Sequence, residues 1–105
     1  MSSITLLASV RRAGRLLPRR AAGLRAGVVV LRPGEVMPWH STKSREELLI
    51  PLRGSLRVES RRSRRVRRIP LESGQCLLLP RQTLHRVING STKLARYMYV
   101  TAPAK

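Results

Sequence analysis

Short runs of apolar residues, separated by glycine, proline or asparagine at intervals of about ten residues, dominate the chain. This pattern is typical of antiparallel sandwiches and barrels, and no segment of useful length shows the period of an amphipathic helix. Turns are expected at Pro33-Gly34 and Asn89-Gly90. The expected strands cover residues 28–31, 36–40, 48–52, 56–59, 77–79, 84–88 and 95–101. The pattern therefore predicts an all-β protein.

Some stretches fit this pattern less well. Pro51 breaks the run 48–52, and proline is tolerated mainly at a sheet edge or a bulge. Residues 4–10 are expected to pair at the sheet edge or with a partner subunit, and the pattern does not place residues 11–26. We therefore expect three parts, namely an N-terminal basic segment, a barrel and a frayed tail. Their ranges are 1–26, 27–101 and 102–105.

The length of 105 residues allows one domain with one core. No apolar stretch approaches the roughly 18 residues that cross a bilayer, so no membrane span is expected. The single cysteine, Cys76, lies in an apolar run and is predicted to be a small buried side chain. One cysteine cannot form an internal disulfide, which favours a cytoplasmic location. The acid-free, arginine-rich start of the chain leaves an organellar presequence as the alternative.

The formal charge of +17 comes from 19 arginines and 3 lysines against five glutamates. Such a balance predicts attraction to polyanions, although genome composition or growth at high temperature would also explain it. Six arginines fall within residues 61–68, which are expected to form the tip and start of a hairpin. Arginines there can contact phosphates, but no aromatic residue is interleaved for stacking on bases. We expect a solvated hairpin with non-specific affinity for nucleic acid.

The only two histidines lie in regularly spaced frames. The first frame is Gly34, five residues, His40, one residue, Thr42, four residues, Glu47, six residues and Gly54. The second frame is Gly74, five residues, Pro80, four residues, His85, three residues and Asn89. Because side chains alternate along a strand, one interior can receive His40, Glu47 and His85 together.

Two imidazoles and a carboxylate suit a divalent transition metal such as Fe, Mn, Ni, Co or Zn, and leave coordination positions open. Glu46 competes with Glu47 as the third ligand. The six residues between Glu47 and Gly54 select Glu47, and Glu46 is expected to point outward. The alternative is a metal-free interior in which His40 and His85 are hydrogen-bonded to Glu47.

The two frames resemble the signature motifs of the cupin superfamily, G(X)5HXH(X)3-4E(X)6G and G(X)5PXG(X)2H(X)3N, over residues 34–89. Thr42 replaces the second histidine of the first motif, and Gln82 replaces a glycine of the second. The resemblance implies a small single-domain jelly-roll barrel with a metal held by His40, Glu47 and His85. Thr42 then stands in the position of the missing fourth ligand, where it could hydrogen-bond a water, whereas Gln82 affects only a turn.

Proteins of this kind include dioxygenases, isomerases, decarboxylases, epimerases and modules that only bind a small molecule, so the fold does not determine the reaction. We expect one metal and dioxygenase-like or isomerase-like action on a small oxygenated or anionic molecule, with no catalytic residue assigned. The alternatives are a non-enzymatic protein that binds or senses a small ligand or metal, and a nucleic-acid-associated protein that uses its arginine-rich surface. Small cupins commonly form homodimers that bury a sheet edge, and a homodimer is expected here.

Overall fold

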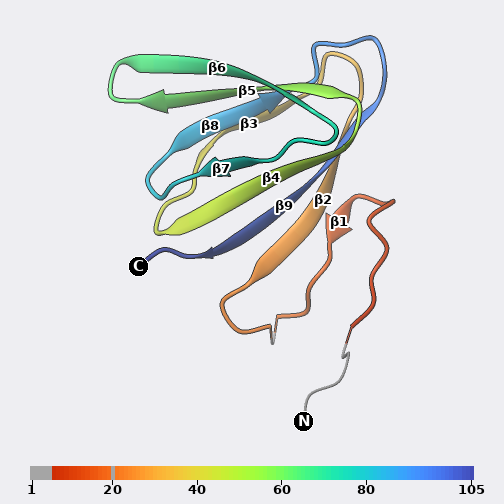
Figure 1. Cartoon of the computed structure of the whole chain (residues 1–105), viewed down its shortest axis with the longest axis vertical. Coiled ribbons are helices and arrows are strands. Elements are labelled where there is room, and N and C mark those ends of the chain that lie inside the picture. Colours follow the sequence, from red (N-terminus) through yellow and green to blue (C-terminus); the bar gives the residue numbers. More distant parts are fainter. Residues whose placement is uncertain (1–5, 20) are drawn as a thin grey trace.

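The computed structural model describes residues 6–19 and 21–105, and within them the chain forms antiparallel strands in two facing sheets (Figure 1). The strands are β1 (Gly14–Arg15), β2 (Arg25–Leu31), β3 (Val36–Ser41), β4 (Arg45–Arg53), β5 (Ser55–Arg62), β6 (Arg65–Glu72), β7 (Leu77–Leu79), β8 (Leu84–Ile88) and β9 (Ala95–Pro103). The predicted all-β fold is confirmed. Among the described residues, no helix is long and apolar enough to cross a membrane.

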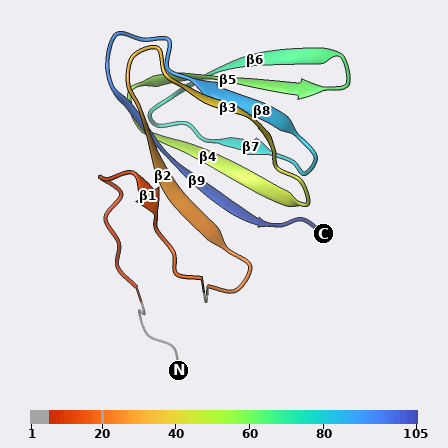
Figure 2. The ribbon, with the colours of Figure 1, turned by 180° about the vertical axis from the view of Figure 1, so that it is seen from behind.

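One sheet has the order β1-β2-β9-β4-β7 and the other has the order β3-β8-β5-β6. The chain passes from one sheet to the other between β2 and β3 and again between β3 and β4, which is the connectivity of a jelly roll. The two layers face each other in both views (Figure 2). Their inner faces meet in a core that includes Leu49 from β4, Val58 from β5 and Val87 from β8.

Alternation along β4 determines which of its side chains reach the interior. Glu47, Leu49 and Pro51 are buried, and the residues between them are more exposed. The strand does not break at Pro51, as the sequence suggested, but continues to Arg53. Proline is tolerated there because β7 pairs only with residues 47–49 and the register with β9 shifts just after Pro51.

The two ends of the chain differ from expectation. Of the predicted edge segment 4–10, residues 4 and 5 lie outside the described residues, and residues 6–10 form no strand. The edge is instead occupied by β1, whose Gly14 and Arg15 pair with β2. At the other end, β9 runs into the predicted tail as far as Pro103, because β4 offers partners along its whole length.

Cys76 is exposed, so its predicted burial is wrong. It lies in the irregular stretch between the turn after β6 and β7, which begins only at Leu77. Within this short edge strand Leu79 is buried, whereas Leu78 is exposed, because alternate side chains face opposite sides of the sheet. The apolar run from Cys76 was therefore not a continuous buried strand.

Two positions of the spaced frames have left-handed backbone conformations. Gly54 has φ 85°, and a Cβ there would lie 2.9 Å from the carbonyl oxygen of Leu94. Gln82 has φ 58°, a conformation that strains a residue with a side chain by about 1 kcal/mol. The glycine of the family motif would adopt it without this strain. The presence of Gln82 in place of glycine therefore lowers the stability of the fold, although the sequence suggested that it affects only a turn.

Gly54→Ala is expected to lower the free energy of unfolding by about 2 kcal/mol or more, because it combines left-handed strain with a backbone collision. Urea unfolding measures the change. Gly34→Ala is the matched control, since Gly34 has φ 81° but no atom within 4 Å of the added Cβ. If the two variants lose equal stability, the close approach at Gly54 does not exist.

Candidate metal centre

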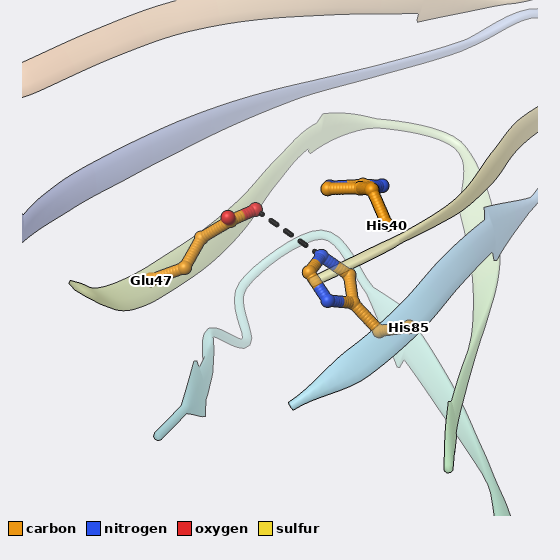
Figure 3. Close-up of side chains that lie close together, drawn as sticks. All are labelled: His40, Glu47 and His85. Atoms are coloured by element: carbon orange, nitrogen blue, oxygen red, sulfur yellow. Dashed lines mark ion pairs between the residues drawn. The ribbon is translucent and has the colours of Figure 1, made fainter. Parts of the chain in front are cut away.

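His40 on β3, Glu47 on β4 and His85 on β8 converge between the two sheets (Figure 3). One ligand atom from each lies within 4.8 Å of the others. Two of the strands belong to the four-stranded sheet and β4 belongs to the other, so the three residues bridge the sandwich. The structure thus brings together the three residues that the spacing selected.

A bulge in β3 turns His40 toward this cluster. Met37 pairs with Val87 and His40 pairs with His85, so β3 uses one residue more than β8 over this span. A bulge of this kind lets two side chains an odd number apart face the same side. Met37 packs against the core, and the rings of His40 and His85 have centroids 4.1 Å apart.

Both imidazoles are oriented by a backbone carbonyl two residues earlier. His40 Nδ1 lies 2.8 Å from the carbonyl oxygen of Pro38, and His85 Nδ1 lies 3.1 Å from that of Thr83. A carbonyl can only accept, so each Nδ1 carries the proton that it donates, and the Nε2 of a neutral ring keeps its lone pair. Carbonyl groups that orient a histidine in this way are typical of metal sites. The sequence analysis missed both groups, because main-chain direction is not visible in residue types.

The Nε2 atom of His85 is buried and has no hydrogen-bond partner among the described residues. Its nearest acidic neighbour is Glu47 Oε2, at 3.5 Å, the pair marked in Figure 3. A buried nitrogen without a partner costs about 1–3 kcal/mol. An interior held by a hydrogen bond from His85 to Glu47 would have satisfied this atom, so the geometry favours a site that could bind a metal ion.

The site is closed on one side and open on the other. Glu47 and His85 are buried, whereas His40 is exposed. Glu46, the competing carboxylate, is exposed on the opposite face of β4. A metal held here would therefore have a protein side and a side that an external molecule can reach.

Thr42 is buried, but its hydroxyl bonds to the backbone of another loop and not, as the sequence suggested, to a water at the metal site. It donates to the carbonyl oxygen of Pro80 at 2.8 Å and accepts from the backbone N–H of Thr83 at 3.0 Å. These bonds tie the β3–β4 turn to the loop that precedes β8. The only hydroxyl proton is already used, so Thr42 positions the loop of His85 and does not donate to a water at the site.

Tyr97 is a buried neighbour of the site on β9. Burial raises the pKa of its hydroxyl well above the ordinary value, and the negative charge of Glu47 and the neighbouring Tyr99 raise it further. The hydroxyl therefore stays neutral. Tyr99 lies over Gly27 of β2, where a side chain would overlap the aromatic ring.

An open groove of about 1100 Å³ adjoins the site, between residues 15–19 and 21–26 on one side and the β3–β4 turn on the other. Glu47 and Tyr99 form part of its wall, and Glu47 is the only acidic residue among those that line it. The cationic residues along the groove are Arg15, Arg19, Arg25, Lys43 and Arg45. Arg45 is held by the carbonyl oxygen of Gly23 and by Thr101. Sequence reasoning missed this groove, because its two sides come from distant segments.

Comparison with known proteins identifies the fold. The family model described as "Cupin domain" matches residues 27–101, which include both spaced frames. The chain belongs to the cupin family. None of the curated proteins matches this cupin.

Solved structures resemble this cupin along most of its length. The cupin domain of Schizosaccharomyces pombe Cnp3 aligns with a TM-score of 0.76 at 18% identity, over 88% of this chain and 64% of that one. An oxalate oxidase aligns with a TM-score of 0.72 at 20% identity, over 77% of this chain and 42% of that one. The cupin domain of Drosophila melanogaster CENP-C aligns with a TM-score of 0.69 at 17% identity, over 80% and 59%. This cupin thus spans less than two thirds of each of these chains, and the similarity is one of fold.

Proposed function

We propose that this cupin binds one divalent transition metal through His40, Glu47 and His85 and acts there on a small anionic molecule. The observation that carries the proposal is the buried Nε2 of His85, which has no hydrogen-bond partner among the described residues and lies 3.5 Å from a carboxylate oxygen of Glu47. Two imidazoles with free Nε2 atoms and one carboxylate match the ligand preferences of first-row transition metals.

The groove beside Glu47 supports an anionic substrate. Its five cationic side chains face a single carboxylate, so the local field attracts negative charge. A guanidinium that is already fixed, as in Arg45, can bind a carboxylate or phosphate with little loss of side-chain entropy. An oxalate oxidase that shares this fold has been solved in complex with glycolate, which is a small anion like the substrate proposed here.

A metal bound by three protein ligands can act as a Lewis acid, or lower the pKa of water, at its remaining positions. The residues of this chain have separate tasks around it. Pro38 and Thr83 hold the two imidazoles through their carbonyl groups, Thr42 fixes the loop of His85, and the open side at His40 admits the substrate. This arrangement suits dioxygenase-like or isomerase-like chemistry on a small oxygenated anion.

Glu47→Gln is expected to lower the affinity for added Mn²⁺, Fe²⁺ or Zn²⁺ about tenfold or more, because loss of a direct ligand costs at least as much as loss of a residue that orients one. Glu46→Gln is the matched control. It removes the same charge one residue earlier, from an exposed position on the same strand. Isothermal titration on metal-stripped protein measures both variants.

Equal affinities for the two variants would refute the assignment of Glu47. Small carboxylates incubated with the metal-loaded protein, with and without dioxygen, then separate an enzyme from a binding protein. Turnover that disappears in Glu47→Gln and persists in Glu46→Gln supports catalysis. Binding without turnover under every condition identifies a non-enzymatic cupin.

A further inference from the structure

The outer face of the four-stranded sheet, opposite the core, carries a cluster of charges that the metal centre does not use. Glu59 on β5 pairs in register with Arg86 on β8 and with Arg68 on β6. Its side chain is only 5% exposed although its neighbour Val58 is the residue that points into the core. No further layer of described residues covers this face, so arginine side chains cover Glu59 (Figures 1 and 2).

The contacts of Glu59 leave part of its arginine partners free. Arg86 uses Nε and Nη2 on Oε1, at 2.7 and 2.6 Å. The nearest contacts of Arg57 and Arg68 to Glu59 run from Nε to Oε2, at 3.5 and 3.4 Å, and their side chains are 51% and 67% exposed. More than half of each of these two side chains is thus accessible, so guanidinium N–H groups that Glu59 does not bind can donate to phosphate oxygens.

Glu59 keeps its charge at neutral pH. The hydrogen bond from Arg86 lowers the pKa of the carboxyl group, the positive charges of Arg86, Arg57 and Arg68 lower it further, and burial opposes them. The ionised carboxylate therefore stays paired with the guanidiniums of Arg57, Arg68 and Arg86. Glu59 thereby fixes the positions of these three arginines on the outer face.

Trp39 adds an aromatic surface to the same face. The guanidinium carbon of Arg86 lies 4.9 Å from the centre of the Trp39 ring, within the range of a cation–π contact. Trp39 is 37% exposed, and it precedes His40, which the bulge in β3 turns inward. The aromatic platform that the basic segment 61–68 lacks is thus supplied by a distant strand.

We propose that this face binds single-stranded nucleic acid, with a base stacked on Trp39 and with backbone phosphates contacted by Arg57 and Arg68. By strand register Arg61 and Glu72 also lie on this face, so four arginines there face two glutamates and the net charge is positive. Non-specific single-strand binding combines positive charge along the backbone with aromatic surfaces for the bases. An acidic protein segment would satisfy the arginines but has no base to place on Trp39.

The test uses the fact that Trp39 is the only tryptophan of the chain. Titration with a short oligodeoxythymidine is expected to quench its fluorescence, and the affinity is expected to fall steeply with salt. Trp39→Ala should weaken binding about tenfold, as loss of a stacked base does, whereas Trp39→Tyr keeps most of it. Fluorescence anisotropy of a labelled strand measures the affinities, and circular dichroism verifies the fold of each variant.

A charge-matched pair separates this face from simple polyanion attraction. Arg57→Ser with Arg68→Ser removes two charges from the outer face and leaves Arg86 as the partner of Glu59. Arg62→Ser with Arg65→Ser removes the same charge from the same hairpin, but from side chains that line a groove on its other side. The outer pair is expected to weaken binding at least several-fold more than the control pair.

Equal losses in the two double variants would overturn the proposal, because binding would then follow net charge alone. Strand binding without quenching of Trp39 would overturn it too. Heparin, a polyanion without bases, should compete for the arginines without the quenching produced by oligodeoxythymidine. Tighter binding and stronger quenching by polyglutamate would instead make this face an acidic-protein surface. None of these measurements depends on the metal.

Discussion

His85→Ala is expected to reduce the metal content of the purified protein from about one ion per chain to almost none. His85 is the fully buried member of the three candidate ligands, and its Nδ1 is fixed by the carbonyl oxygen of Thr83. Without His85 only His40 and Glu47 remain as ligands. Two protein ligands bind a first-row transition metal too weakly to keep it through purification. Elemental analysis by mass spectrometry after gel filtration measures the loss.

His85→Leu separates loss of metal from loss of packing, because leucine refills most of the space. In the metal-stripped state this variant is expected to be about as stable as the unmodified protein, because removing a nitrogen that has no partner among the described residues offsets the loss of the Nδ1 bond to Thr83. With saturating metal the unmodified protein should become the more stable of the two, because ligand binding stabilises only the protein that binds it. Unchanged metal content in His85→Ala would refute the site, and equal stabilisation of both proteins by metal would refute it as well.

Asn89→Ala is expected to lower the free energy of unfolding by about 3 kcal/mol, because it removes several buried hydrogen bonds at once. The Asn89 amide donates to the carbonyl oxygens of Leu31 and Lys93, at 2.9 and 2.8 Å. Its oxygen accepts from the backbone N–H and the hydroxyl of Ser91. These bonds join the end of β2 to the loop that connects β8 and β9, at one end of the sandwich (Figures 1 and 2). Denaturant unfolding of the metal-free protein measures the loss.

Ser91→Ala is the comparison for this prediction. It removes one hydroxyl from the same network but leaves both donors of the Asn89 amide in place, so about 1 kcal/mol or less should be lost. Metal content should stay unchanged in folded Asn89→Ala, because the amide is engaged by the carbonyl groups of Leu31 and Lys93. A loss of metal without a loss of stability would make Asn89 part of the site.

Local sequence features predicted the cluster of His40, Glu47 and His85 because each feature depends on a short stretch of chain. Alternation along one strand separates Glu47, which is buried, from Glu46, which is exposed. The frames around His40 and His85 carry the turns that start and end the strands of these three residues, and one of these turns requires the glycine at position 54. The fold class could be predicted in the same way, from apolar runs and the turns between them.

Features that depend on pairing between distant strands could not be predicted from the sequence. Thr42 appeared to be a substitute ligand, but the register between two loops joins its hydroxyl to Pro80 and Thr83. Cys76 was expected in the core and is exposed, because its strand starts one residue later at a sheet edge. In both cases the residue type and the local pattern were compatible with more than one environment.

The sequence by itself determined an all-β cupin chain and three residues able to bind a metal, since strand alternation and turn residues act over a few neighbouring positions. Only the tertiary structure decided that the Nε2 of His85 lacks a partner in the described part of the chain, that a cationic groove adjoins Glu47, and that Trp39 lies against Arg86. The physical reason is that a bulge and the pairing of distant strands set these contacts, and a change of one residue in register moves a side chain to the opposite face.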